Sequence, residues 1–285
     1  MNFKQTGRRR KVRRVATAER ILKTACLFFF VVGILTVTFL RSEGAGSLGR
    51  RKKILITAHR GASHGAPENT KASVALAIEE GADYAEIDVR LTEDGIPVLM
   101  HDRALFRTVG MVNEVDKVTY EELTACDVGI RYGAAFAGER VPGLKEVLED
   151  YGKKIRFNIE LKDGLDYELA QAVVKLIEEL GLEERCVITL DSYEQLEWIK
   201  ENNEKIRTGY ILGLVYGEIF HCDAADFFSV RSDCITEQMI KNLHARGKEI
   251  HAWTVNQESE IKRMQAIGVD NIITDKPAYV REIIQ

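Results

Sequence analysis

Proline is scarce in this chain, with four among 285 residues, whereas 45% of the residues are hydrophobic. This composition excludes a proline-rich or low-complexity disordered chain and is typical of a globular protein with a full-sized core. The length accommodates a leader and one domain of about 230 residues. Metal-site cysteine spacing is also missing, because none of the five cysteines falls in a C-x-x-C pattern. We expect mostly buried thiols, with Cys222 and Cys234 the only two near enough in sequence to suggest a disulfide.

Acidic residues outnumber basic residues over most of the chain. From Ile54 onward there are 26 basic and 42 acidic residues, a formal charge of −16. Such a domain repels nucleic acid and anionic membrane surfaces, so we expect no nucleic-acid partner. If the domain acts on an anionic phosphodiester, local cations must overcome this field, which favours a bound metal ion.

Basic residues are concentrated before the domain. Residues 1–23 hold nine Lys or Arg against Glu19, and the 17 uncharged residues 24–40 follow. That is at the short end for a membrane-spanning helix, about 17–25 residues, and long for a signal-peptide core, about 7–15. Because the bulky Phe39-Leu40-Arg41 lacks a small-x-small cleavage pattern, we favour an uncleaved transmembrane helix over a secretory signal. The positive-inside rule then predicts a cytoplasmic N-terminus, a cell-membrane location and an extracellular domain after a linker at 41–53. Cleavage would make the domain secreted.

Short β-type runs alternate with amphipathic helical stretches from residue 54 to the end. The expected strands are 54–58, 84–89, 154–161, 186–190, 207–212, 226–230, 249–253 and 271–274. The expected helices are 70–80, 143–151, 165–180, 192–201, 236–245, 257–267 and 278–284, and the connection 213–225 holds at most a short helix. Eight such units in about 230 residues predict an α/β fold, a (β/α)8 TIM barrel over 54–285. An open doubly wound sheet is the alternative.

The stretch 91–142 breaks this rhythm. It has a hairpin-like turn at Thr92-Glu93-Asp94-Gly95 and another short strand at 96–100. We interpret it as a small insertion between the second strand and its helix.

Histidine, carboxylate and basic side chains cluster at the ends of the expected strands. The motifs, in order, are His59-Arg60-Gly61, Pro67-Glu68-Asn69-Thr70, Glu86-Ile87-Asp88, His101-Asp102 and Asn158-Ile159-Glu160-Leu161-Lys162. In a barrel of this kind the loops at the carboxyl ends of the strands form the active site, so these groups should converge on one face. The second motif is equally interpreted as a helix start, with Asn69 or Thr70 as the N-cap.

The second and third expected strands both contain carboxylate side chains. Because residues two apart on a strand point the same way, Glu86 and Asp88 should share a face, and so should Glu160 and Lys162. Three carboxylates brought together without a cation would repel one another and raise their own pKa values. A divalent ion would turn them into an oxygen cage, and all-oxygen ligation selects Ca²⁺ or Mg²⁺ over zinc.

The five motifs, in this order, resemble the glycerophosphodiester phosphodiesterase family. The resemblance implies a TIM barrel with an insertion after the second strand, and Glu86, Asp88 and Glu160 as ligands of one divalent cation. It also implies hydrolysis of glycerophosphodiesters such as glycerophosphocholine to sn-glycerol 3-phosphate and a free alcohol.

The roles of the remaining site residues form a mechanistic hypothesis. We expect His59 and His101 to share acid and base catalysis, in an order that the sequence leaves open. We expect Arg60 and Lys162 to bind the phosphate oxygens. Trp253, at the end of the seventh strand, is interpreted either as a contact for the glycerol or head group or as a core aromatic.

Several other residues receive a structural interpretation, namely Asp275 and Pro277 as the start of the last helix, and His64, His221, His244 and His251 as structural or solvated side chains. The substrate is a small-molecule glycerophosphodiester or a lipid head group. A lysophospholipase D-like or glycerophosphate-polymer hydrolase would use the same site, and a barrel that binds glycerophosphate without turnover is the alternative from another class.

Overall fold

The structure is a computed structural model that describes residues 53–162, 167–213 and 222–285. The chain divides into two units, 1–52 and 53–285, and the first lies outside the described residues. The basic segment and the helix expected at 24–40 belong to that first unit and stay predictions. Within the described ranges, every helix is too short or too polar to cross a membrane.

Eight parallel strands form a closed barrel. The hydrogen-bonded order is β1-β9-β8-β7-β6-β5-β4-β2, and β2 pairs back onto β1 with Tyr84 opposite Thr57. The strands are β1 (Leu55–Ala58), β2 (Tyr84–Leu91), β4 (Arg156–Leu161), β5 (Cys186–Leu190), β6 (Arg207–Leu212), β7 (Phe227–Arg231), β8 (Glu249–Trp253) and β9 (Asn271–Thr274). Because β1 has a parallel partner on each side, the predicted barrel is confirmed and the open doubly wound sheet is wrong.

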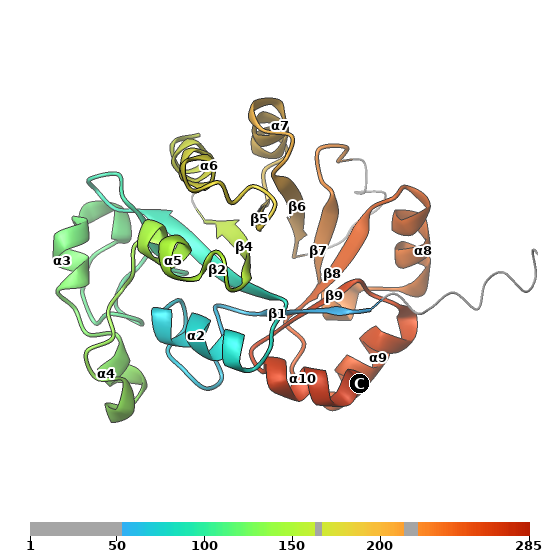
Figure 1. Ribbon diagram of the computed structural model, residues 1–285, viewed down its shortest axis with the longest axis horizontal. Helices are drawn as coiled ribbons and strands as arrows, with labels where there is room; N and C mark the ends of the chain where they lie inside the picture. The colour runs from blue at the N-terminus through green and yellow to red at the C-terminus, as the bar shows by residue number, and fades with distance from the viewer. Residues whose placement is uncertain (1–52, 163–166, 214–221) are drawn as a thin grey trace, which may run out of the picture. The chain divides into compact units, whose positions relative to one another are not determined.

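Helices surround the strands on the outside of the barrel (Figure 1). They are α2 (Lys71–Glu79), α5 (Leu144–Tyr151), α6 (Glu168–Leu180), α7 (Tyr193–Asn202), α8 (Glu237–Ala245), α9 (Glu258–Ile267) and α10 (Pro277–Ile284), with a 3₁₀ turn η3 (Ser232–Cys234) before α8. Each buries an apolar stripe against the sheet, as α6 does with Val173, Val174 and Ile177. Full burial of one such side chain contributes about 1.5–3 kcal/mol. Among the described residues of the 213–225 connection there is no helix.

The segment between β2 and α5 forms a small lobe of its own. Strand β3 (Pro97–Leu99) pairs antiparallel with the end of β2 and is followed by η1 (Val115–Lys117), α3 (Tyr120–Thr124), α4 (Gly129–Tyr132) and η2 (Ala134–Phe136). Figure 1 shows α3 and α4 beyond α2 and α5, to one side of the barrel. The lobe has a separate apolar core around Leu105, Leu123 and Val128. These residues support the loop that carries His101.

The barrel interior holds a small aromatic cluster at the amino ends of the strands. Tyr84, Val187 and Phe227 form a buried cluster there, and the ring of His251 stacks on Phe227 at 4.0 Å. Gly209 makes room for this cluster, since a Cβ at that position would lie 2.2 Å from the Phe227 ring. Tyr84 is on the same face of β2 as Glu86 and Asp88. One strand therefore helps to fill the base of the barrel and also supplies carboxylates to its mouth.

The third expected strand and the suspected disulfide differ from the structure. The strand expected from residue 154 begins at Arg156, because the N–H groups of Lys154 and Ile155 bind the carbonyl of Tyr151 and close the end of α5. The suspected disulfide is absent, since Cys222 and Cys234 are free thiols, as are Cys126 and Cys186.

Candidate active site

Three carboxylates meet at the carboxyl end of the barrel. Glu86 and Asp88 lie on β2, and Glu160 lies opposite Asp88 on the neighbouring β4. Glu86 and Asp88 are almost wholly buried, at 2% and 1% exposure. One oxygen from each of the three lies within 4.8 Å of the others. The structure thus brings together the three residues that the sequence predicts as metal ligands.

Two cationic side chains lie against these carboxylates. Lys162 Nζ is 3.1 Å from Asp88 Oδ1 and also contacts Glu160, while Arg60 Nε is 3.3 Å from Asp88 Oδ2. Burial opposes ionisation of Asp88, but Lys162 and Arg60 outweigh it and hold the pKa of Asp88 below its usual value. Burial and the charge of Asp88 raise the pKa of Glu86 well above its usual value, and they raise the pKa of Glu160 as well. The cluster therefore has more negative charge than its own cations neutralise.

The donor set fits a hard cation. Glu86 Oε2 accepts the backbone N–H of Arg60 at 2.7 Å. Glu86 Oε1, in contrast, is buried and has no hydrogen-bond partner among the residues that the structure describes. A buried, unpaired oxygen costs free energy, and a cation beside it would pair it and lower the raised pKa of Glu86. Three carboxylates without a thiolate are ligands for an oxygen-seeking divalent ion.

His59 is held by an aspartate from the last strand–helix connection. Its Nδ1 lies 2.7 Å from Asp275 Oδ1, and the same carboxylate accepts from Ser63 Oγ at 3.1 Å and from Asn256 Nδ2 at 2.6 Å. Burial opposes ionisation of Asp275, but His59, Asn256 and Ser63 together outweigh it and hold the pKa of Asp275 below its usual value. An ionised carboxylate only accepts, so Nδ1 carries the proton and Nε2 is left for other chemistry. The interpretation of Asp275 as part of a helix start alone is therefore wrong.

His101 is held by the residue next to it. Its Nδ1 lies 2.6 Å from Asp102 Oδ1, and the other oxygen of Asp102 accepts from Arg107 Nε. Burial opposes ionisation of Asp102, yet Arg107 and His101 lower its pKa to about 2. Burial lowers the pKa of His101, which favours the neutral ring. The second histidine thus presents the same Nδ1-to-carboxylate arrangement as the first.

The Pro67-Glu68-Asn69-Thr70 loop serves both the helix and the site. Thr70 is the N-cap of α2 and accepts from the backbone N–H of Ser73, as one interpretation of this motif predicts. Asn69 instead turns to the carboxylates, since its Nδ2 donates to Asp88 Oδ2 at 2.8 Å and its Oδ1 accepts the Asp88 backbone N–H. Asn69 adopts a positive φ of 56° to do so. The amide thereby fixes the orientation of Asp88.

Gly61 allows this loop to pack on α2. It has a φ of +75°, and a Cβ there would lie 2.3 Å from Ser73 Oγ. Ser73 Oγ donates in turn to the carbonyl of Arg60 at 2.9 Å. The glycine of the first motif is thus required by close packing that brings Arg60 to the carboxylates.

A cavity of about 200 Å³ opens over these groups. Every predicted site residue lines it except Asp88, which lies behind Lys162 and Arg60. Its walls also include the buried polar side chains of Asn158, Thr189 and Ser229. Trp253 lines it from the end of β8, and its Nε1 is buried without a hydrogen-bond partner within the described ranges. The cavity therefore combines anionic, cationic and imidazole groups with neutral donors.

The sequence motifs leave out Asp275 and Asn256 beside His59, and Arg107 beside Asp102. Asp275 and Asn256 follow β9 and β8, where polar residues at strand ends are the available signal. Arg107 is in an irregular loop of the insertion and has no such signal. The other described histidines do not line the cavity: His244 pairs with Asp270 at 2.8 Å and His251 lies in the base of the barrel.

Known proteins have this fold and are similar in sequence. Residues 59–279 match the Glycerophosphoryl diester phosphodiesterase family. A glycerophosphodiester phosphodiesterase of Caldanaerobacter subterraneus subsp. tengcongensis is 35% identical over 240 residues, covering 82% of this chain and 98% of that protein. A phosphodiesterase of Oleispira antarctica, solved in complex with the product sn-glycerol-3-phosphate, is 30% identical with a TM-score of 0.75 and matches 81% of this chain and 96% of its own. The glycerophosphodiester phosphodiesterase of Agrobacterium tumefaciens has a TM-score of 0.69 at 26% identity, over 80% of this chain and all of its own. The resemblance in the motifs is confirmed, and this chain belongs to the glycerophosphoryl diester phosphodiesterase family of enzymes.

Proposed function

We propose that this protein hydrolyses glycerophosphodiesters, such as glycerophosphocholine, to sn-glycerol 3-phosphate and an alcohol with one divalent cation, Ca²⁺ or Mg²⁺. One observation carries the proposal: two members of a three-carboxylate cluster line the same cavity as two carboxylate-bound imidazoles. The Oleispira antarctica structure with sn-glycerol-3-phosphate supports the same product.

The charged groups bind and polarise the phosphate. Glu86, Asp88 and Glu160 would hold the cation, which supplies Lewis-acid stabilisation of negative charge on the phosphoryl oxygens when bound. Arg60 and Lys162 already lie at the cavity wall, where they attract an anionic ester into an otherwise acidic domain.

The two imidazoles move protons. Each uses Nδ1 to donate to a carboxylate, so each offers Nε2 to the ester. One accepts the proton of the attacking oxygen as the new P–O bond forms. The other protonates the alcohol oxygen as its P–O bond breaks.

Turnover and metal dependence are tested together on the purified full chain with glycerophosphocholine. We expect release of glycerol 3-phosphate that a chelator abolishes and that Ca²⁺ or Mg²⁺ restores. Glu160→Gln removes one proposed ligand, so it should raise the cation concentration needed for half-maximal rate about tenfold or more. Glu149→Gln, on the exposed face of α5, is the matched control. Tight binding of the ester without product would support the non-catalytic alternative.

Metal binding should weaken as the pH falls. Because the pKa values of Glu86 and Glu160 are raised in the metal-free protein, protons compete with the cation on the acid side. Titration calorimetry in two buffers should show lower affinity at pH 5.5 than at pH 8, with proton release on binding. An affinity that is unchanged between these pH values would contradict the proposed ligand set.

We also infer that residues 24–40 hold the protein in the cell membrane with the barrel outside. The uncharged run and the nine basic residues before it support this inference. Membranes washed with alkaline carbonate should retain the full chain, and protease added to intact cells should digest the barrel. Recovery of the chain in the wash, or in the medium without residues 1–40, would favour peripheral association or a cleaved signal.

A further inference from the structure

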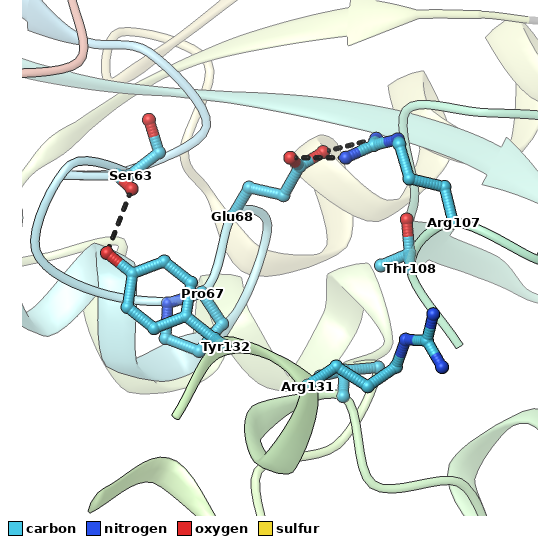
Figure 2. A pocket seen from close by; sticks show the side chains of 8 residues that line it. Ser63, Pro67, Glu68, Arg107, Thr108, Arg131 and Tyr132 are labelled. Carbon is cyan, nitrogen blue, oxygen red and sulfur yellow. Dashed lines mark hydrogen bonds and ion pairs between the residues drawn. The ribbon is translucent and has the colours of Figure 1, made fainter. Parts of the chain in front are cut away.

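Arg107 joins two parts of the active site through one guanidinium group. Its two terminal nitrogens donate to the two oxygens of Glu68, each at 2.7 Å, and its Nε donates to Asp102. Figure 2 shows the guanidinium group of Arg107 facing the Glu68 carboxylate. Arg107 belongs to the insertion, whereas Glu68 belongs to the loop after β1, so this contact connects the insertion to the barrel.

Both acidic partners of Arg107 reach groups at the cavity. Asp102 uses its remaining oxygen for His101 Nδ1 at 2.6 Å. Glu68 Oε1 also accepts from Arg60 Nη1 at 3.0 Å. A continuous series of charged hydrogen bonds therefore runs from the proton-transfer ring of His101 through the insertion to the phosphate-binding Arg60.

His101 depends on this contact for the orientation of its ring, which Asp102 holds, although Arg90 of β2 donates to its backbone carbonyl at 2.9 Å. His101 follows β3 in a bend, and Asp102 beside it is likewise outside any strand or helix. Arg107 is half-exposed, and an isolated exposed ion pair of this kind adds little stability. A planar fork that donates to two carboxylates nevertheless sets distance and angle far more tightly than a point charge does.

We propose that Arg107 is a positioning residue for the hydrolysis, holding His101 through Asp102 and Arg60 through Glu68 in one fixed geometry across the cavity. Arg107 thereby contributes to the chemistry without touching the substrate. This inference rests on the proposed function, since it assumes that His101 transfers a proton.

Kinetics of Arg107 variants of the full chain test the proposal. Arg107→Ala should lower kcat about 10- to 100-fold and change KM little, since a misplacement near 1 Å costs about that much in rate. Arg107→Lys keeps the charge but not the fork and should recover little. Guanidinium ion at millimolar concentration should restore part of the rate to Arg107→Ala, because a cavity of about 200 Å³ beside Arg107 gives access to the vacated position.

Arg103→Ala is the matched control. Arg103 is in the same insertion and pairs with Glu114 and Asp116 at the surface, away from the cavity. It should keep wild-type kcat and KM. Full activity in Arg107→Lys would show that charge alone suffices, and equal losses of kcat and melting temperature in both alanine variants would show a general structural role. Either result overturns the proposal.

A spectroscopic readout separates this proposal from the proposed function. The Nδ1 proton of His101, assigned by its loss in His101→Ala, should give a downfield NMR signal that vanishes in Arg107→Ala and persists in Arg103→Ala. A signal unchanged in Arg107→Ala overturns the positioning role whether or not the protein hydrolyses the ester. Wild-type turnover by His101→Ala would instead refute the proposed function.

Discussion

The two histidines of the site reach the same arrangement by different routes. His59 directly follows β1, and its backbone N–H donates to the carbonyl of Thr274 at 2.8 Å. Its partner Asp275 is 216 residues away in sequence and is held by neutral donors. His101 is paired with its own neighbour in a loop, which Arg107 holds by charge. The barrel itself positions one proton-transfer group, whereas ion pairs from an insertion position the other.

The largest expected effect comes from removing either ring. His59→Ala and His101→Ala should each lower kcat/KM by about 100- to 10,000-fold, because each takes away one proton transfer in the transition state. Initial rates with glycerophosphocholine at saturating cation would measure this, and circular dichroism would check that the barrel stays folded. If one variant kept a rate within about tenfold of wild type, the two histidines would not be equally important for proton transfer.

Replacing the two carboxylate partners, Asp102 and Asp275, by asparagine should affect the two histidine rings differently. In Asp102→Asn, the guanidinium of Arg107 can only donate, so it should draw the amide oxygen and turn the NH₂ group toward His101. The ring would then be forced into the wrong tautomer. In Asp275→Asn, the amide oxygen can stay where His59 and Ser63 both donate. The tautomer is then kept, while the negative charge and the hydrogen bond from Asn256 to the second oxygen are lost.

We therefore expect kcat to fall about 100-fold in Asp102→Asn and about tenfold in Asp275→Asn. Steady-state rates of the two pure variants would show the order. The Nδ1 proton signals of the two histidines provide the control, since the His101 signal should disappear and the His59 signal should remain. Equal losses, or the reverse order, would mean that the donors around each aspartate do not control the tautomer.

The same contrast explains what the sequence could predict. Buried β-type runs give clear periods, so six of the eight expected strands end at the predicted residue, and the positions of Glu86, Asp88 and Glu160 follow from local patterns. Asp275 could not be paired with His59 by any local pattern, because the pairing depends on β9 lying beside β1. Likewise, Asn69 looks like a helix cap until the fold brings it 2.8 Å from Asp88.

The insertion was the least predictable region. Helices α3 and α4 span five and four residues, too few to show a helical period. Strand β2 continues to Leu91, past the predicted end at 89, because β3 gives its last residues an antiparallel partner. The contact of Arg107 with Glu68 depends on how this lobe packs, which no short motif records.

A third histidine, His251, is buried, and its replacement should affect stability and leave activity unchanged, which is the smallest expected effect. His251 stacks on Phe227 at the opposite end of the barrel, and its Nε2 is 3.5 Å from Glu249 and has no hydrogen-bond partner in the described part of the chain. Burial lowers its pKa below the ordinary value of 6.5, so the unfolded chain takes up a proton before the folded one does. Stability should therefore fall as the pH drops below about 6.5, by up to about 1.4 kcal/mol per pH unit for this group.

His251→Gln removes this titration. Urea unfolding at pH 8 and pH 5.5 should therefore show a smaller loss of stability on acidification in the variant, with wild-type kcat at pH 8. His244→Gln, at the barrel surface beside Asp270, is the control. If wild type and His251→Gln lost stability equally on acidification, His251 would have to be protonated or solvated in the folded barrel, and its contrast with the two carboxylate-bound rings would fail.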